Sequence, residues 1–264
     1  MYKKVRGVLS KMKRLDGKVA IVTGSNSGIG KATAIRFAQE GAHLVLCARR
    51  EALLEEVAKE CRTYGVEAIV VPADVTSHEA CTKVVKTAIE RFGKIDILVN
   101  NAGIADKHRP ITECDDAWWD YVIAVDQTSL FYLTKDVLPH MLERKSGSII
   151  NVSSIGGVFG SAGISYSTAK SGVLGFTKNV AIQVAPDGIR CNAVCPGPTP
   201  TPLNAPEQIK TFTTWFADQT AQHMNMTLPE SNVVDQANAI LFFASDESVA
   251  VTGQILIVDH GTTL

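Results

Sequence analysis

Short apolar runs recur along this chain, and most are followed by a longer segment in which apolar residues repeat at helical spacing. A short run that ends at glycine or at polar residues predicts a strand, whereas the longer amphipathic segments predict helices. The expected strands cover residues 18–23, 43–48, 68–72, 95–100, 148–153, 190–195 and 255–258. The expected helices cover residues 29–40, 51–64, 77–92, 115–144, 165–184 and 233–244.

The order of these elements indicates the fold class. Strands that are apolar throughout and alternate with helices are typical of a parallel sheet that is covered on both faces. No internal repeat, low-complexity stretch or linker divides the sequence. We therefore predict a single doubly wound α/β domain over residues 15–264, with a mostly parallel seven-stranded sheet and helices on both faces.

One segment interrupts the alternation of strands and helices. Residues 198–232 begin with the proline-rich run PTPTPLNAP and continue as a polar, partly helical stretch. A long insert without a clear element is usually a lid or a binding loop. We expect this segment to be a substrate lid.

Composition narrows the class of protein. Apolar residues make up 45% of the chain and charged residues 20%, and 26 Lys and Arg balance 27 Asp and Glu to a net charge of −1. These values exclude a disordered chain, a collagen-like chain and a strongly cationic nucleic-acid binder. No apolar run approaches the ~20 residues that a membrane span needs.

The positive charge is concentrated at the N-terminus. Residues 1–14 hold six basic residues and no acid, so residues 15–264 carry 20 Lys and Arg against 27 Asp and Glu, a net charge of −7. We expect residues 1–14 to be a basic extension before the fold, solvated or packed on a partner. Contact with a membrane surface, or targeting to an organelle, is the less favoured interpretation.

The six cysteines predict neither disulfides nor a metal site. No Cys-x-x-Cys pair occurs, and no histidine lies near Cys191 or Cys195 in the sequence. We expect reduced thiols, a cytoplasmic location and no bound metal.

The first expected strand runs into a glycine-rich turn, TGSNSGIG, which contains Gly24, Gly28 and Gly30. Glycine lets backbone N–H groups approach a pyrophosphate at the positive end of a helix. Because this turn follows a strand and opens a helix, it predicts a dinucleotide site that includes Ser27 and Ile29.

The spacing G-x-x-x-G-x-G after a threonine resembles the short-chain dehydrogenase/reductase family, and the resemblance continues along most of the chain. The further family motifs are Asp74-Val75, Asn100-Asn101-Ala102-Gly103, Ser153-Ser154, Tyr166-x-x-x-Lys170, Pro196-Gly197 and Val251-Thr252-Gly253. The resemblance implies a Rossmann fold, a nicotinamide cofactor and an oxidoreductase. The cofactor contacts that it implies are Asp74 and Val75 at the adenine, Asn101, Ala102 and Gly103 along the cofactor, Pro196 and Gly197 after the sixth strand, and Thr199 and Thr201 at the nicotinamide end.

The end of the second expected strand indicates which nicotinamide cofactor binds. A carboxylate at this position would hold the ribose 2′-hydroxyl of NAD. The chain has Ala48 there, followed by Arg49 and Arg50, whose guanidinium groups suit a 2′-phosphate. We therefore predict NADP(H) in preference to NAD(H), with Arg49 as the leading contact. The alternative is that both arginines only begin a solvated helix.

Tyr166 and Lys170 lie four residues apart in an expected helix and so share one face. An ammonium and an oxidised nicotinamide both favour the phenolate, so we expect a lowered pKa for Tyr166. The resemblance implies that this tyrosine takes the alcohol proton or returns it to the ketone, while the lysine also holds the nicotinamide ribose. It further implies that a serine orients the substrate oxygen and that the nicotinamide carries the hydride.

Two features of the expected site depart from the family. Ser153 has the commoner spacing to Tyr166, whereas Ser154 precedes the following loop as the family's catalytic serine does. Neighbouring strand residues face opposite sides, so only one serine faces the site, and we predict Ser154. Asp126 stands where the family has asparagine, whose main-chain carbonyl helps to hold a water near the lysine. Its carboxylate is expected to raise the pKa of Lys170, unless the side chain points elsewhere.

The lid and the loop after the fifth strand are rich in apolar residues. They are Phe212, Trp215, Phe216, Met224 and Met226 in the lid and Val158, Phe159 and Ile164 in the loop. Such side chains suit a bulky apolar ketone or alcohol, for example a hydroxysteroid, although they would serve equally to pack the lid on the body. We predict an NADP-dependent oxidoreductase that interconverts a secondary alcohol and a ketone. A 3-oxoacyl thioester reductase is the competing enzyme, and a non-catalytic dinucleotide-sensing protein is the competing class.

The helix expected over residues 165–184 is apolar or small on nearly all sides. One side can face the sheet, and another needs a partner, for which the helix within residues 115–144 is a natural neighbour. The sequence thus predicts a two-fold helix-pair interface and a homodimer or homotetramer.

Overall fold

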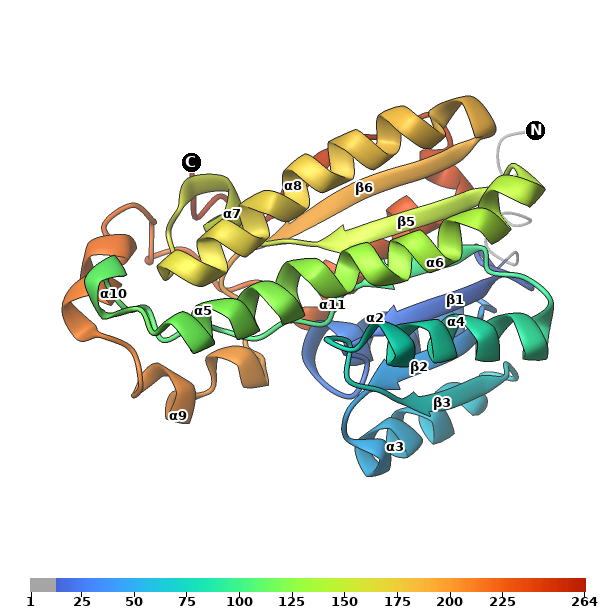
Figure 1. The fold of residues 1–264 in the computed structure, drawn as a ribbon, viewed down its shortest axis with the longest axis horizontal. Helices are drawn as coiled ribbons and strands as arrows, with labels where there is room; N and C mark the ends of the chain where they lie inside the picture. The colour runs from blue at the N-terminus through green and yellow to red at the C-terminus, as the bar shows by residue number, and fades with distance from the viewer. Residues whose placement is uncertain (1–12) are drawn as a thin grey trace, which may run out of the picture.

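The computed structural model describes residues 13–264 as one parallel sheet between layers of helices (Figure 1). The strands lie in the order β3-β2-β1-β4-β5-β6-β7, and every neighbouring pair is parallel. The strands are β1 (Val19–Thr23), β2 (His43–Ala48), β3 (Ala68–Pro72), β4 (Ile97–Asn100), β5 (Gly147–Val152), β6 (Ile189–Pro196) and β7 (Ile255–Val258). The order reverses between β1 and β4, and α/β sheets bind their ligands beyond the carboxyl ends of the strands at such a point.

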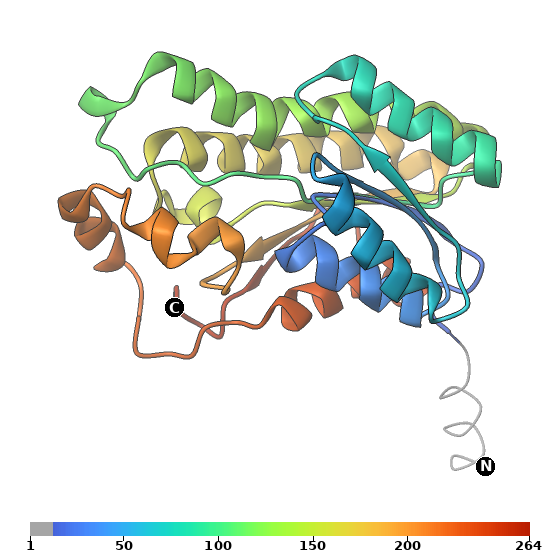
Figure 2. The same cartoon turned by 90° about the horizontal axis from the view of Figure 1, so that it is seen from below.

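Helices cover both faces of the sheet (Figure 2). They are α2 (Gly28–Gln39), α3 (Glu51–Arg62), α4 (His78–Phe92), α5 (Asp116–Ile123), α6 (Ser129–Arg144), α7 (Ile155–Phe159), α8 (Ile164–Val184), α9 (Pro206–Ile209), α10 (Thr214–Ala221) and α11 (Val233–Ala244). Along β1, Ala20 and Val22 pack into the apolar layer of α2, α3 and α11, whereas Ile21 packs into that of α4, α6 and α8. The core is therefore two apolar layers, which confirms the doubly wound α/β prediction.

The helix expected over 115–144 is divided in the structure. α5 ends at Ile123, a π-helical turn covers Ala124–Thr128, and α6 begins at Ser129. Apolar periodicity does not reveal such a turn, because the helix axis continues through it. π turns are frequent at functional sites, and this one contains Asp126.

The segment 198–232 contains two short helices, α9 and α10, which agrees with the partly helical character of its sequence. It lies at the end of the molecule toward which the strand arrows point (Figure 1). The short helix α7, which follows β5, was not predicted. Both features lie at the carboxyl ends of the strands, where the site is built.

The predictions for the basic extension, residues 1–14, fall almost entirely outside the described residues. Arg14 lies 2.9 Å from Glu40 and 3.5 Å from Glu247, and the next residue, Leu15, is fully buried. Within residues 13–264, no helix has the length and apolar character that crossing a membrane requires.

Candidate active site

The first two turns of α8 carry Tyr166 and Lys170. The Lys170 ammonium lies 5.5 Å from the centre of the Tyr166 ring, because residues one helical turn apart project from the same face. Ser154 follows β5, and a Cβ at Gly156 would lie 3.5 Å from its hydroxyl and 3.6 Å from the Tyr166 ring, so the two side chains are neighbours. The structure thus brings the three predicted catalytic side chains together at the carboxyl end of β5.

The two candidate serines have different surroundings. The Ser153 hydroxyl is buried and donates to the main-chain carbonyl of Lys170 over 2.8 Å. The Ser154 hydroxyl accepts from the N–H of Gly156 over 3.1 Å and lies on the side of Tyr166. The geometry therefore favours Ser154 as the serine that meets the substrate.

Asp126 is buried against the predicted catalytic lysine. Its Oδ2 lies 3.5 Å from Lys170 Nζ, and its Oδ1 accepts from the N–H of Ile104 over 2.8 Å. The ammonium also donates to the main-chain carbonyl of Val152 over 3.2 Å. Gly103 borders the pair closely, since a Cβ there would lie 3.2 Å from Nζ. The carboxylate at position 126 therefore points at the lysine and not elsewhere.

Burial and charge shift the pKa of all three ionisable groups. Burial raises the pKa of Asp126 to about 6, although Lys170 acts in the opposite direction. Burial alone would lower the pKa of Lys170, but Asp126 and Tyr166 outweigh it, so this pKa is raised. Burial raises the pKa of Tyr166, Lys170 lowers it, and Asp126 raises it again, with a net upward shift. The lowered tyrosine pKa that we expected is therefore not produced by the chain's own residues alone, because burial and then Asp126 offset the lysine.

A further acidic residue, which the sequence did not point to, caps α8. Asp106 is buried; its Oδ2 accepts from the N–H of Tyr166 over 3.0 Å and from the Ser165 hydroxyl over 3.3 Å. Its Oδ1 accepts from the N–H of His108 over 3.1 Å. The first N–H groups of a helix lack partners within the helix, and Gly163, which precedes α8, supplies no side-chain cap. Asp106 therefore fixes the turn of the helix that carries the catalytic tyrosine.

The glycine-rich turn between β1 and α2 fits the diphosphate of a dinucleotide. Gly24 and Gly28 have φ angles of +63° and +53°, which favour glycine. A Cβ at Gly30 would overlap the Gly24 carbonyl, so the turn packs closely on the helix. Ser27 precedes α2 without using its hydroxyl as a cap, and Ile29 lies in the first turn. The open N–H groups of that turn are the donors that a phosphate binds.

The predicted cofactor residues after β4 hold the start of the glycine-rich turn in place. The Asn101 side chain donates to the carbonyl of Thr23 over 2.9 Å. The main-chain N–H groups of Asn101 and Ala102 both donate to the Thr23 hydroxyl over 2.9 Å. These bonds tie the ends of β1 and β4 together, so the residues shape the edge of the predicted nucleotide site.

The residues after β3 lie at the same edge of the sheet. Asp74 accepts from the N–H of Thr76 over 3.0 Å and from its hydroxyl over 2.8 Å, and these bonds hold the pKa of the Asp74 carboxyl below its ordinary value. Val75 is buried in the apolar layer on the α4 side. Asp74 is thus held as an ionised acceptor where the family places the adenine.

The two arginines after β2 have different partners. Arg49 donates to the hydroxyl of Tyr121 over 2.8 Å, a contact that the sequence did not reveal. Arg50 donates from its Nε to the amide oxygen of Asn26, in the glycine-rich turn, over 3.0 Å. Both side chains are exposed beside the predicted nucleotide site.

The residues after β6 lie near the glycine-rich turn. Pro196 ends β6, and Gly197 follows it. Thr199 is buried and donates to the carbonyl of Gly197 over 2.9 Å, so its hydroxyl is turned to the main chain. A Cβ at Gly28 would lie 3.2 Å from the methyl of Thr201, which places Thr201 over the glycine-rich turn.

The comparisons with known proteins agree with this geometry. The chain matches the family model described as Enoyl-(Acyl carrier protein) reductase over residues 24–263. A cis-4-hydroxycyclohexanecarboxylate dehydrogenase of Sinomonas cyclohexanicum is 42% identical over 247 residues, 93% of this chain and 96% of that protein. A 3beta-hydroxysteroid dehydrogenase 2 of Eggerthella lenta is 36% identical over 255 residues, 94% of this chain and 95% of that protein. The solved structure of carveol dehydrogenase from Mycobacterium avium in complex with NAD has a TM-score of 0.87 at 30% identity and covers 95% of this chain and 99% of that one.

The chain belongs to the short-chain dehydrogenase/reductase family. The match runs from the glycine-rich turn almost to the last residue and includes Tyr166 and Lys170. This short-chain dehydrogenase/reductase is therefore an oxidoreductase of the kind that uses NAD(H) or NADP(H).

The lid of this short-chain dehydrogenase/reductase packs on the loop after β4. Phe212 stacks on His108 with ring centres 4.3 Å apart, and the N–H of Thr213 donates to the carbonyl of Lys107 over 3.3 Å. Trp215, by contrast, is 62% exposed and faces solvent. The other exposed members of the predicted apolar set are Val158, Phe159 and Met226. The predicted apolar residues thus do not gather around one site.

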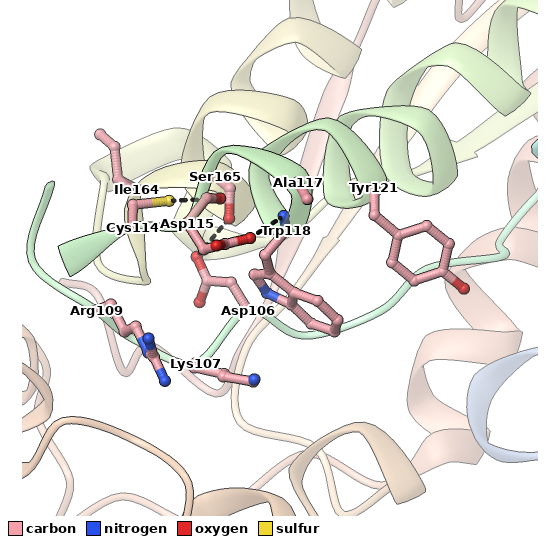
Figure 3. A pocket seen from close by; sticks show the side chains of 10 residues that line it. All are labelled: Asp106, Lys107, Arg109, Cys114, Asp115, Ala117, Trp118, Tyr121, Ile164 and Ser165. Atoms are coloured by element: carbon pink, nitrogen blue, oxygen red, sulfur yellow. Dashed lines mark hydrogen bonds between the residues drawn. The ribbon is translucent and has the colours of Figure 1, made fainter.

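A cavity of about 370 Å³ opens between the loop after β4, α5 and the start of α8 (Figure 3). Of its lining residues, only Ile164 was among the predicted substrate contacts. The other lining residues are Asp106, Lys107, Arg109, Cys114, Asp115, Ala117, Trp118, Tyr121 and Ser165. This charged wall could not be predicted from the sequence, because the loop after β4 has no periodic pattern.

The structure offers no metal centre in the part of the chain that it describes. Within residues 13–264, no three His, Cys, Asp or Glu side chains are grouped so that they would hold a metal ion. All six cysteines are free, and burial raises the pKa of Cys191 to about 12, which keeps that thiol protonated.

Proposed function

We propose that this protein is an NADP-dependent enzyme that interconverts a secondary alcohol and a ketone on a bulky, mainly apolar ring substrate such as a hydroxysteroid. The observation that carries the reaction is the juxtaposition of Ser154, Tyr166 and Lys170. The ring substrate is supported by two relatives, which are named for a hydroxycyclohexanecarboxylate and a 3beta-hydroxysteroid.

Ser154 and Tyr166 are neighbouring side chains, and we expect both to meet one substrate oxygen. Ser154 orients that oxygen by a hydrogen bond, and Tyr166 donates a proton to it in ketone reduction or accepts one from it in alcohol oxidation. A raised pKa keeps the phenol protonated at neutral pH, which favours reduction. The Lys170 ammonium stabilises the phenolate that proton donation leaves. The bound nicotinamide cofactor supplies or accepts the hydride.

The charges after β2 support the preference for NADP(H). Ala48 occupies the position at which an NAD site has a carboxylate. Tyr121 engages one terminal nitrogen of Arg49, so the other donors of that guanidinium are left for a 2′-phosphate. Arg50 adds a second positive charge beside the glycine-rich turn.

A 3-oxoacyl thioester reductase is the second candidate. The description of the matching family model, which names an acyl carrier protein, favours it. Both candidates use the same proton chemistry and differ in what the lid and the cavity hold. A dinucleotide sensor without catalysis is disfavoured, because Ser154, Tyr166 and Lys170 are all present and adjacent.

Exposed apolar side chains support the proposed homodimer or homotetramer. Phe131 on α6 is 46% exposed and Ile182 on α8 is 76% exposed. Two-fold pairing of these helices would remove both from water. The six free thiols support the proposed cytoplasmic location.

Turnover measurements test the proposed function. Cyclic ketones, 3-oxosteroids and 3-oxoacyl thioesters are offered with NADPH and with NADH to the wild type and to Tyr166→Phe. We expect the ring ketones to be reduced with NADPH, and this activity to be lost in the variant. Preferred turnover of thioesters would favour the second candidate, and tight cofactor binding without any turnover would contradict both.

A further inference from the structure

The cavity beside α8 contains two cations without ion-pair partners. Lys107 and Arg109 line it, and neither forms an ion pair with any residue of 13–264. The Lys107 ammonium lies 4.9 Å from the centre of the Trp118 ring. Both side chains project from the loop after β4 to the same side (Figure 3). Two unpaired cations, one held against an aromatic face, make this wall attractive to an anion.

A third donor lies in the same cavity. The indole N–H of Trp118 is buried and has no hydrogen-bond partner among the described residues. Buried donors are nearly always paired, and an unpaired one costs free energy. An acceptor on a ligand would satisfy it.

The carboxylates of the cavity already accept hydrogen bonds. Asp106 accepts from the N–H groups of Tyr166 and His108, and Asp115 accepts from the N–H of Trp118 over 2.9 Å. Asp106, which also accepts from the Ser165 hydroxyl, therefore has few lone pairs left for a cationic ligand. The two negative charges also disfavour a doubly charged phosphate relative to a singly charged group. The cavity therefore suits a carboxylate.

The cavity and the reacting group are close neighbours on α8. Ser165 lines the cavity, and the next residue is Tyr166. We infer that the substrate is a hydroxy or keto acid, whose carboxylate is bound by Lys107, Arg109 and the Trp118 N–H while its alcohol or ketone meets the tyrosine. This inference rests on the proposed alcohol–ketone chemistry.

Kinetics on matched acids and esters test the inference. The substrates are 4-oxocyclohexanecarboxylate, 3-(4-oxocyclohexyl)propanoate and their methyl esters. Lys107→Gln and Arg109→Gln are compared with the wild type and with Lys86→Gln, which makes the same change at an exposed lysine of α4. Each of the first two variants is expected to raise KM for an acid about tenfold or more, because a charge-assisted hydrogen bond is lost. The expected change in kcat is less than about twofold, with KM for the esters and all constants of Lys86→Gln unchanged.

An equal effect on acids and esters, or no effect on either, would overturn the inference. Calorimetric titration of the full chain with the corresponding hydroxy acid and its methyl ester gives a readout without turnover. The acid is expected to bind more tightly than the ester, and Lys107→Gln to remove the difference. Equal affinities, or an acid that binds without competing against a neutral ketone, overturn the inference. Preferred acid binding without turnover contradicts the proposed function and leaves this site supported.

Discussion

Replacing Asp126 by asparagine removes the carboxylate that is buried against Lys170. Burial holds the pKa of this carboxyl at about 6, against an ordinary value of 3.8. The folded chain therefore binds this proton more tightly than the unfolded chain does. The stability that this bound proton contributes is fully present below pH 3.8 and is lost as the pH rises through about 6. The difference between the two pKa values corresponds to about 3 kcal/mol of unfolding free energy at neutral pH.

Asparagine has nearly the same shape and does not titrate. Asp126→Asn is therefore expected to exceed the wild type in unfolding free energy by up to about 3 kcal/mol near pH 7.5, and to match it near pH 4. This difference in unfolding free energy already includes the attraction between Lys170 and the carboxylate. Lys170 lowers the pKa of Asp126, and the pKa of about 6 is what remains after that effect. Guanidinium denaturation at several pH values measures the difference. A variant less stable than the wild type near pH 7.5 would refute the reasoning, since the ionised carboxylate would then be stabilising on balance.

The same variant reports on the proton chemistry. Asp126 contributes to the raised pKa of Tyr166, after burial and against the effect of Lys170. Its removal is expected to shift the acid limb of the pH–rate profile for alcohol oxidation to lower pH. Superimposable profiles of the wild type and the variant would exclude Asp126 from catalysis.

Four further substitutions test the cofactor site and the catalytic group. Arg49→Glu is expected to lower kcat/KM with NADPH by about 10- to 100-fold and to improve the use of NADH, because a charge-assisted bond to the 2′-phosphate is lost. An unchanged ratio between the cofactors in steady-state assays would contradict the NADP assignment. Ser154→Ala is expected to lower kcat by about 100-fold or more, and Ser153→Ala by less than about tenfold; kinetics in the opposite order would exchange their roles. Asp106→Asn removes a charge that raises the pKa of Tyr166, so the pH–rate profile for alcohol oxidation is expected to move to lower pH. A profile that moves to higher pH would contradict this effect of Asp106.

The strands could be predicted from the sequence because each apolar run ends where its strand leaves the core. The bounds of β2, β3 and β7 agree with the predicted ones for this reason. The same pattern placed the glycine-rich turn and Tyr166 at one edge of the sheet, since the carboxyl ends of parallel strands meet there. The pattern of neighbouring residues was therefore sufficient to predict these features.

Features that depend on distant contacts could not be predicted in this way. Asp106 caps a helix from 60 residues away, and no periodicity marks it. The π turn around Asp126 preserves the helix, so the apolar spacing does not signal it. Lys107 becomes part of a cavity only because Trp118 lies across from it in the fold. The net upward shift in the pKa of Tyr166 also depends on the fold, because it comes first from burial and then from the position of the Asp126 carboxylate.

The first turn of α8 obtains its cap from another part of the chain, and this affects the order of folding. Until the loop after β4 has docked, the N–H of Tyr166 has only water as its partner, and an uncapped helix end frays. Contacts between residues so far apart in sequence form slowly, because a long loop must close first. During refolding, enzyme activity is therefore expected to return after the helical circular-dichroism signal. The predicted catalytic tyrosine is thus expected to be the last part of its own helix to become ordered.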